Sequence, residues 1–169
     1  MSYFISTDRR LNPLVATAGF YHEEILLDHI GIAQQLKTRL SIFPEALKRE
    51  SLRILHARRQ GYLSDLKTFA ARADWFMFHR ILLDALRITL QALFSVNEVY
   101  YPGDKWLRQS IIRFGLDAQI LTWFDRLWEA SGNASEKMVA LRQLMDLVEG
   151  HETGERHPVG ESGDGLNIP

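Results

Sequence analysis

The sequence predicts an all-α fold, a bundle of about six helices around a long, buried central helix, and two observations carry this prediction. Hydrophobic residues make up 46% of the 169 residues and include nine Phe and four Trp, which is ample for one well-filled core. Beyond the first thirty residues, capping residues, glycines and prolines divide the chain into segments of helical length.

The first thirty residues are the least helical part of the sequence. Pro13 and Gly19 interrupt this region, and the apolar run between Glu24 and Asp28 is short enough for a strand. One or two short strands are therefore expected before Gly31.

Two helices are predicted after this irregular start. The first covers 32–40, and a turn then places Pro44 in the first turn of the second. The second helix should continue to about Gln60, because Gly61 is a typical stop residue.

The longest helix is predicted from near Arg72 to about Glu98. At about 100° per residue its polar side chains share one narrow stripe, while nearly every other direction carries large apolar side chains. The stripe consists of Arg80, Asp84, Arg87, Gln91, Ser95 and Glu98. A helix this apolar should be the buried spine of the fold.

Capping and stop residues define the remaining helices. They are expected over 105–114 between Asp104 and Gly115, from Asp117 through Ala130, and over 134–149 after the capping-box pair Asn133 and Glu136. The segment 150–169 is rich in glycine and has almost no large apolar side chains, so it is expected to be a disordered tail. The sequence thus predicts a single helical domain over 1–149.

Composition narrows the classes of function. The formal net charge of -1 argues against a general nucleic-acid or membrane-surface binder. With no cysteine, disulfides and thiolate chemistry are excluded, and a cytoplasmic location is expected. The first ten residues do not resemble a signal peptide, and no apolar stretch is long enough to predict a membrane span.

Common catalytic and metal-binding signatures are missing from the sequence. It contains no Walker-type phosphate loop, no Gly-x-Gly-x-x-Gly, no Gly-x-Ser-x-Gly and no His-Glu-x-x-His. The six histidines form no pair at helical ligand spacing, so no metal site is expected.

The second predicted helix carries a concentrated basic face. Its members are Lys48, Arg49, Arg53 and Arg59, with His56 and Gln60 beside them. These side chains are suited to holding phosphates. The alternative is a solvated face whose charge is balanced by acidic residues elsewhere, which is the usual role of such runs.

Arg72 and His79 form a second candidate pair. On the predicted spine helix they project within about 20° of each other, so they are expected to line one shallow groove. Their order resembles the loose Arg-then-His signature of the HEPN helical ribonucleases and antitoxin-partner domains, and the resemblance implies RNA cleavage by this pair. The alternative is that Arg72 and Asp74 supply charge near the start of a helix.

The segment from Asn97 to Trp106 concentrates uncommon residues where the buried helix ends. Tyr100 and Tyr101 offer stacking faces, Asn97 a directional amide, and Lys105 a mobile cation near a helix N-terminus. This combination suits a nucleotide. The alternative is an aromatic plug in which Tyr100 packs the corner, Asn97 caps the helix and Lys105 is solvated.

Three pieces of sequence in a fixed order carry a family resemblance. They are Ala-Ala-Arg-Ala-Asp at 70–74, Leu-Phe-Ser-Val-Asn at 93–97, and Tyr-Tyr-Pro-Gly-Asp-Lys-Trp at 100–106. This order resembles the helical C-terminal region of an uncharacterised group of nucleotidyltransferase-like proteins, related to the aminoglycoside nucleotidyltransferases. The resemblance covers about 19–149.

The resemblance implies a helical bundle that forms one wall of a cleft, opposite an α/β domain that holds metal and nucleoside triphosphate. The Gly-Ser turn and the Asp-x-Asp pair of that catalytic half do not occur in this sequence. We therefore expect a non-catalytic domain that binds a nucleotide or small polar ligand and has no cofactor of its own. A separate catalytic partner chain would supply the nucleoside triphosphate with magnesium.

Within this resemblance, Lys105 is the phosphate-facing residue, Tyr100 and Tyr101 face base or substrate, and Asn97 anchors the corner. Two alternatives stay open. One is a HEPN-like ribonuclease acting as a homodimer or toxin-antitoxin component, and the other is a helical protein-interaction module.

Overall fold

The computed structural model describes residues 13–22, 24–105, 107–129 and 132–153, and within these ranges the chain is all-α, as the sequence predicts. Its elements are α1 (Pro13–His22), α2 (Ile32–Leu40), α3 (Glu45–Ala71), α4 (Trp75–Val96), α5 (Leu107–Arg113), α6 (Ala118–Trp128) and α7 (Ala134–Thr153). The described part of the chain thus holds seven helices where about six were expected.

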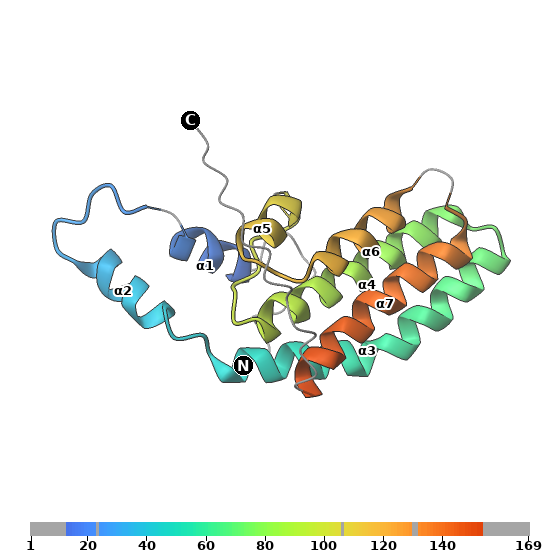
Figure 1. The fold of residues 1–169 in the computed structure, drawn as a ribbon, viewed down its shortest axis with the longest axis horizontal. Helices are drawn as coiled ribbons and strands as arrows, with labels where there is room; N and C mark the ends of the chain where they lie inside the picture. Colours follow the sequence, from blue (N-terminus) through green and yellow to red (C-terminus); the bar gives the residue numbers. More distant parts are fainter. Residues whose placement is uncertain (1–12, 23, 106, 130–131, 154–169) are drawn as a thin grey trace.

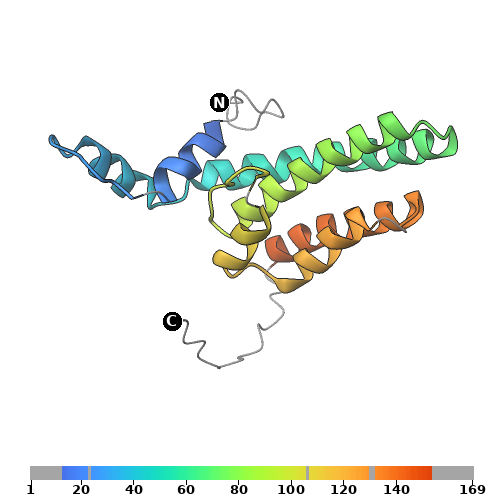
Figure 2. The same cartoon turned by 90° about the horizontal axis from the view of Figure 1, so that it is seen from above.

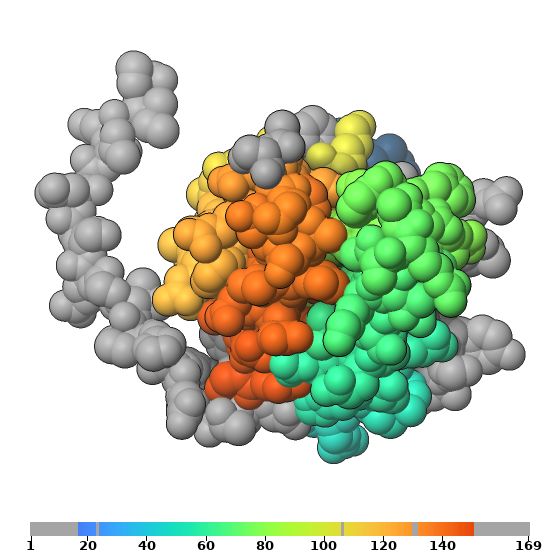
Figure 3. Space-filling view, turned by 90° about the vertical axis from the view of Figure 1, so that its right-hand side faces the viewer, coloured from blue at the N-terminus to red at the C-terminus, as the bar shows by residue number. Residues whose placement is uncertain are grey.

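Two helical hairpins form the body of the molecule. α3 and α4 run antiparallel to each other, and α6 and α7 form a second antiparallel pair that packs on the first (Figures 1 and 2). α4 contacts both α3 and α7 and therefore lies at the centre. Seen from the end where α3 turns into α4, the two pairs lie side by side (Figure 3).

α4 is the buried spine that the sequence predicts. Twelve of its 22 residues are buried. It begins at Trp75 rather than near Arg72, because Ala73 adopts a left-handed φ of 53° and interrupts the helical path. Asp74 then caps α4 by accepting a hydrogen bond from the Met77 amide at 3.1 Å.

The polar stripe of α4 has a buried half and an exposed half. Gln91 and Ser95 lie in the core, where the Ser95 hydroxyl is 3.0 Å from the Ser51 hydroxyl of α3. Towards the N-terminal end, Arg80 is exposed and Arg87 is partly exposed. The stripe is thus accessible along this N-terminal half and at Glu98, which lies beyond the end of α4.

α3 is the longest described helix, whereas the sequence predicted that the spine helix would be the longest. It continues through Gly61 for 27 residues, so the predicted stop there is wrong. Leu55 and Leu66, on either side of Gly61, are both fully buried in the core. Burial of this continuous apolar face outweighs the penalty of roughly 1 kcal/mol for one helical glycine. Pro44 precedes α3 as its N-cap residue instead of lying in its first turn.

An N-terminal arm, consisting of α1, the linker 24–31 and α2, precedes the body. α1 packs on the body through Tyr21 and His22, whereas the linker and α2 project from it (Figures 1 and 2). The expected strands are wrong for the described residues: α1 is a helix, and 24–30 contain neither helix nor strand. Gly19 sits in α1 with open space around its Cα, and the apolar run in the linker has no described strand to pair with.

The arm leaves many apolar side chains in solvent. α2 agrees with its predicted bounds but has no buried residue. The exposed large side chains of the arm and of the following turn are Phe20, Leu26, Leu27, Ile30, Ile32, Leu36 and Ile42. The arm therefore presents an apolar surface that no described element covers.

A predicted stop residue, a predicted cap and the predicted capping box are confirmed in the second half of the chain. Gly115 follows the end of α5 with a φ of 62°. Asp117 caps α6 by accepting a hydrogen bond from the Gln119 amide at 2.7 Å. Asn133 and Glu136 form the expected capping box, with side-chain to amide distances of 3.0 and 2.9 Å.

Several helix bounds differ from the prediction in this half. α6 ends at Trp128 instead of continuing through Ala130. α5 begins at Leu107 instead of residue 105, and the Asp104 carboxylate bonds to Arg87 and Tyr101. α7 continues past Glu149 to Thr153. The remainder of the expected tail, 154–169, lies outside the described residues.

Candidate functional site

The corner after α4 buries the two tyrosines that the sequence analysis singled out. Tyr100 is 4% exposed, packs against the rings of Tyr21 and Phe43, and donates a hydrogen bond to the Leu40 carbonyl at 3.2 Å. Burial raises the pKa of the Tyr100 hydroxyl, and Tyr21 adds a smaller contribution. Asn97 is the C-cap of α4, and its amide donates to the Leu93 carbonyl at 2.8 Å.

Tyr101 connects this corner to the polar stripe of α4. It is 2% exposed, and its hydroxyl donates a hydrogen bond to the Asp104 carboxylate. The same carboxylate accepts a bond from the Arg87 guanidinium at 3.0 Å. Lys105, the next residue, is exposed. Of the four predicted ligand-binding residues, Lys105 therefore presents the most accessible side chain, and it directly follows Asp104, which bonds to Arg87 of the stripe.

Arg72 and His79 do not share a helix. Arg72 is the C-cap of α3, whereas His79 lies in the first turns of α4. The left-handed residue Ala73 and the cap Asp74 separate them, so the expected alignment on one helical face is wrong. The alternative, in which Asp74 acts at a helix start, is confirmed by its hydrogen bond to Met77.

Carboxylates accompany most of the basic face on α3. Lys48 pairs with Glu98 at 3.8 Å, and Arg53 bonds to Glu50 at 2.7 Å. Arg59 contacts both Asp146 and Glu149, and His56 lies 3.8 Å from Glu149. Burial acts to lower the Arg59 pKa, but bonds to and charges on Glu149 and Asp146 raise it overall. Much of this face thus joins α3 to α7, as expected of balanced surface charge.

A shallow hollow of about 600 Å³, called here the α4 hollow, follows the exposed half of the stripe. Its lining consists of Trp75, Phe76, His79, Arg80, Leu83, Asp84 and Arg87. Arg87 is held by Asp84 at 3.9 Å and by Asp104 at 3.0 Å. Aromatic side chains thus lie at one end of the hollow, and cationic side chains lie at the other.

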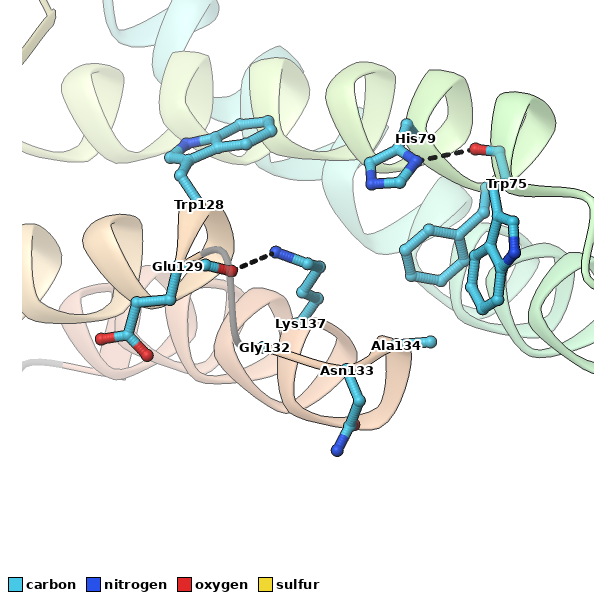
Figure 4. A pocket seen from close by; sticks show the side chains of 9 residues that line it. Trp75, His79, Trp128, Glu129, Gly132, Asn133, Ala134 and Lys137 are labelled. Atoms are coloured by element: carbon cyan, nitrogen blue, oxygen red, sulfur yellow. Dashed lines mark hydrogen bonds between the residues drawn. The ribbon is translucent and has the colours of Figure 1, made fainter.

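A second hollow, called here the tryptophan slot, lies between the start of α4 and the turn from α6 to α7 (Figure 4). It measures about 470 Å³ and is lined by Trp75, Phe78, His79, Trp128, Glu129, Gly132, Asn133, Ala134 and Lys137. Trp75 and His79 line both hollows, so the two adjoin at these residues.

Sequence reasoning missed most residues of these hollows. The spacing of Trp75 and His79, four positions apart near the start of a helix, could have indicated a shared face. Nothing in the sequence places Trp128 or Lys137 beside them, because that contact depends on how α6 and α7 pack on α4.

The described residues contain neither a metal-binding cluster nor a membrane-spanning helix. No group of three or more His, Cys, Asp or Glu side chains in the described ranges is arranged to hold a metal ion. No helix there combines the length and the apolarity that a bilayer span needs.

The fold defines an all-α bundle protein with two adjoining surface hollows on its central helix. A family model described as "Domain of unknown function (DUF4037)" matches residues 14–107, more than half of the chain, and the protein belongs to this family. No curated protein matches the chain, and neither does any solved structure. The match covers the arm, both helices of the first hairpin and the corner, whereas Trp128 and Lys137 lie beyond it.

Proposed function

We propose that this protein is a non-catalytic helical domain of nucleotidyltransferase type, which binds a nucleotide or small polar ligand and acts with a separate catalytic partner chain. The observation that carries this proposal is the α4 hollow, where Trp75 and His79 lie at one end and Arg87 at the other. Aromatic rings stack on bases, and arginine and lysine pair with phosphates.

The corner segment supplies the phosphate end of the proposed site. Asp104 ties the corner to Arg87, and the exposed Lys105 is the next residue along the chain. We assign the phosphate contacts to Lys105 and Arg80 because both side chains are exposed, whereas Arg87 is only partly exposed. Tyr101 and Asn97 then act by holding the corner in place and do not stack on the ligand.

The arm supports the second half of the proposal, a partner chain. Leu26 and Leu27 are 87% and 75% exposed, and α2 has no buried residue. Contiguous apolar surface of this kind typically marks a protein interface. In the proposal, the arm contacts the chain that carries the catalytic carboxylates, the magnesium and the nucleoside triphosphate.

A thermal-shift titration with ATP, GTP, CTP and UTP, each with and without magnesium, tests ligand binding. Binding to the native state raises the Tm by mass action, so at least one nucleotide should give a saturable increase. The increase should disappear in Lys105→Ala and persist in Lys67→Ala, which removes an exposed lysine from α3. If no nucleotide shifts the wild-type Tm, the ligand-binding proposal is wrong.

Light scattering on the purified protein tests the arm. A monomer leaves the arm available for a different chain. A dimer that dissociates in Leu27→Glu would instead assign the arm to a second copy of this protein and contradict the catalytic partner. Ribonuclease activity that disappears in His79→Ala would favour the HEPN-like alternative.

A further inference from the structure

The tryptophan slot has two aromatic walls that are held in place but incompletely covered. Trp75 and Trp128 are 51% and 43% exposed, although large aromatic side chains are mostly buried in folded proteins. Trp75 meets the buried Phe78 edge to face at 6.0 Å, and Trp128 meets Phe124 in the same way at 6.3 Å. These ring contacts fix the orientation of both indoles while each keeps an accessible surface.

His79 provides a hydrogen-bond acceptor in the slot. Its Nδ1 lies 2.7 Å from the Trp75 carbonyl oxygen, as Figure 4 shows. A carbonyl oxygen only accepts, so Nδ1 carries the proton, and Nε2 of the neutral ring is left as an acceptor. In Figure 4 this second nitrogen is on the side of the ring that faces Trp128 and Lys137.

Lys137 provides a donor at the opposite side. Its ammonium donates to the Leu127 carbonyl at 2.6 Å and to the Glu129 carbonyl at 3.2 Å, the last of which Figure 4 draws. These two bonds hold the side chain across the end of α6 and under Trp128. An ammonium has three N–H donors, so this arrangement leaves one for a ligand.

We infer that the tryptophan slot binds a planar nitrogen heterocycle, in the form of a nucleobase. Indole walls fit the faces of such a ring, and an acceptor and a donor fit its edge, which is the pattern of an apolar site with a few placed polar groups. The inference rests on the proposed function in naming the ring as the base of the same nucleotide. Because Trp75 and His79 line both hollows, a base in the slot lies next to the α4 hollow, which Arg80 lines.

Nucleosides test the slot separately from the phosphate contacts. Adenosine, guanosine, cytidine and uridine carry no phosphate, and each is titrated into the protein by calorimetry and by quenching of tryptophan fluorescence. At least one should bind saturably and quench. Trp128→Leu should weaken that binding by roughly 5- to 150-fold, the loss expected for one stacking partner. Because Trp128 is nearly half exposed, the variant should fold, which circular dichroism verifies.

Two further variants make the test specific. Trp123→Phe changes another tryptophan of α6 that does not line the slot, and it should keep both binding and quenching. His79→Leu removes the acceptor and should weaken binding while quenching at saturation persists. If no nucleoside binds up to its solubility limit, or if binding is equal in Trp128→Leu and Trp123→Phe, the inference is overturned.

The two proposals fail in different ways. If triphosphate binding depends on Lys105 but not on Trp128, the slot is refuted and the proposed function stands. If nucleoside binding depends on Trp128 while the triphosphate still raises the Tm equally in Lys105→Ala, the slot is supported and the phosphate assignment is refuted.

Discussion

Replacing Gly61 by alanine should stabilise the protein. Gly61 lies within α3, it is exposed, and a Cβ built on it meets no atom within 4 Å. Alanine favours a helix interior over glycine by about 1 kcal/mol, partly because it restricts the unfolded chain. The free energy of unfolding should therefore rise by about 0.5–1 kcal/mol, and at a size of 150–250 residues each kcal/mol raises the Tm by about 2–4 °C.

Urea and thermal unfolding followed by circular dichroism measure this change. Gly115→Ala is the matched control, because Gly115 has the same chemistry but a φ of 62°. A left-handed alanine costs about 1–2 kcal/mol, so this variant should lose stability. If Gly61→Ala is neutral or destabilising while Gly115→Ala behaves as expected, α3 does not continue as one helix through Gly61, and the reasoning is refuted.

Three further outcomes follow from the structure. Asn133→Ala removes the side-chain acceptor of the α7 capping box and should cost about 1 kcal/mol in urea unfolding, whereas Ser135→Ala nearby should change little. Phe94→Ala empties a fully buried position and should cost about 3–5 kcal/mol, and a loss below about 1 kcal/mol would contradict the assigned core. Burial raises the pKa values of Tyr62 and Tyr100 above the ordinary value of about 10, so the stability they contribute is complete below about pH 10 and is lost as the pH rises through the folded-state pKa. Absorbance titration of native protein should therefore show these two hydroxyls ionising later than in unfolded protein, and Tyr62→Phe should reduce the alkaline loss of stability.

The fold was predictable wherever a local signal agreed with the packing. The capping box at Asn133 and the stop at Gly115 are decided within a few residues, so sequence reasoning found them. The helix stop predicted at Gly61 is wrong because the preference of glycine for ending a helix is small beside the burial of the leucines on either side. The strands predicted before Gly31 are wrong for the described residues because a strand requires a partner and these residues offer none.

The corner after α4 was predicted as a stacking surface, but in the structure its tyrosines hold neighbouring residues in place. Its tyrosines were noticed as stacking surfaces, but Tyr100 and Tyr101 direct their rings into the core and their hydroxyls to Leu40 and Asp104. A sequence records which side chains are present, and burial decides which of their chemical properties remain available. These two side chains therefore act by holding the corner in place. Tyr101 bonds to Asp104, which in turn bonds to Arg87.

The same consideration explains why the accessible aromatic residues escaped notice. Trp75 belongs to a helix so apolar that every large side chain on it was expected in the core, yet the core ends near Phe78. Before that point the exposed side of α4 is approached by the end of α6, which carries Trp128, and by the start of α7, which carries Lys137. An exposed indole does not contribute the free energy that its burial in the core would provide. Two exposed indoles beside a positioned lysine therefore make the tryptophan slot the first place in which to look for a ligand.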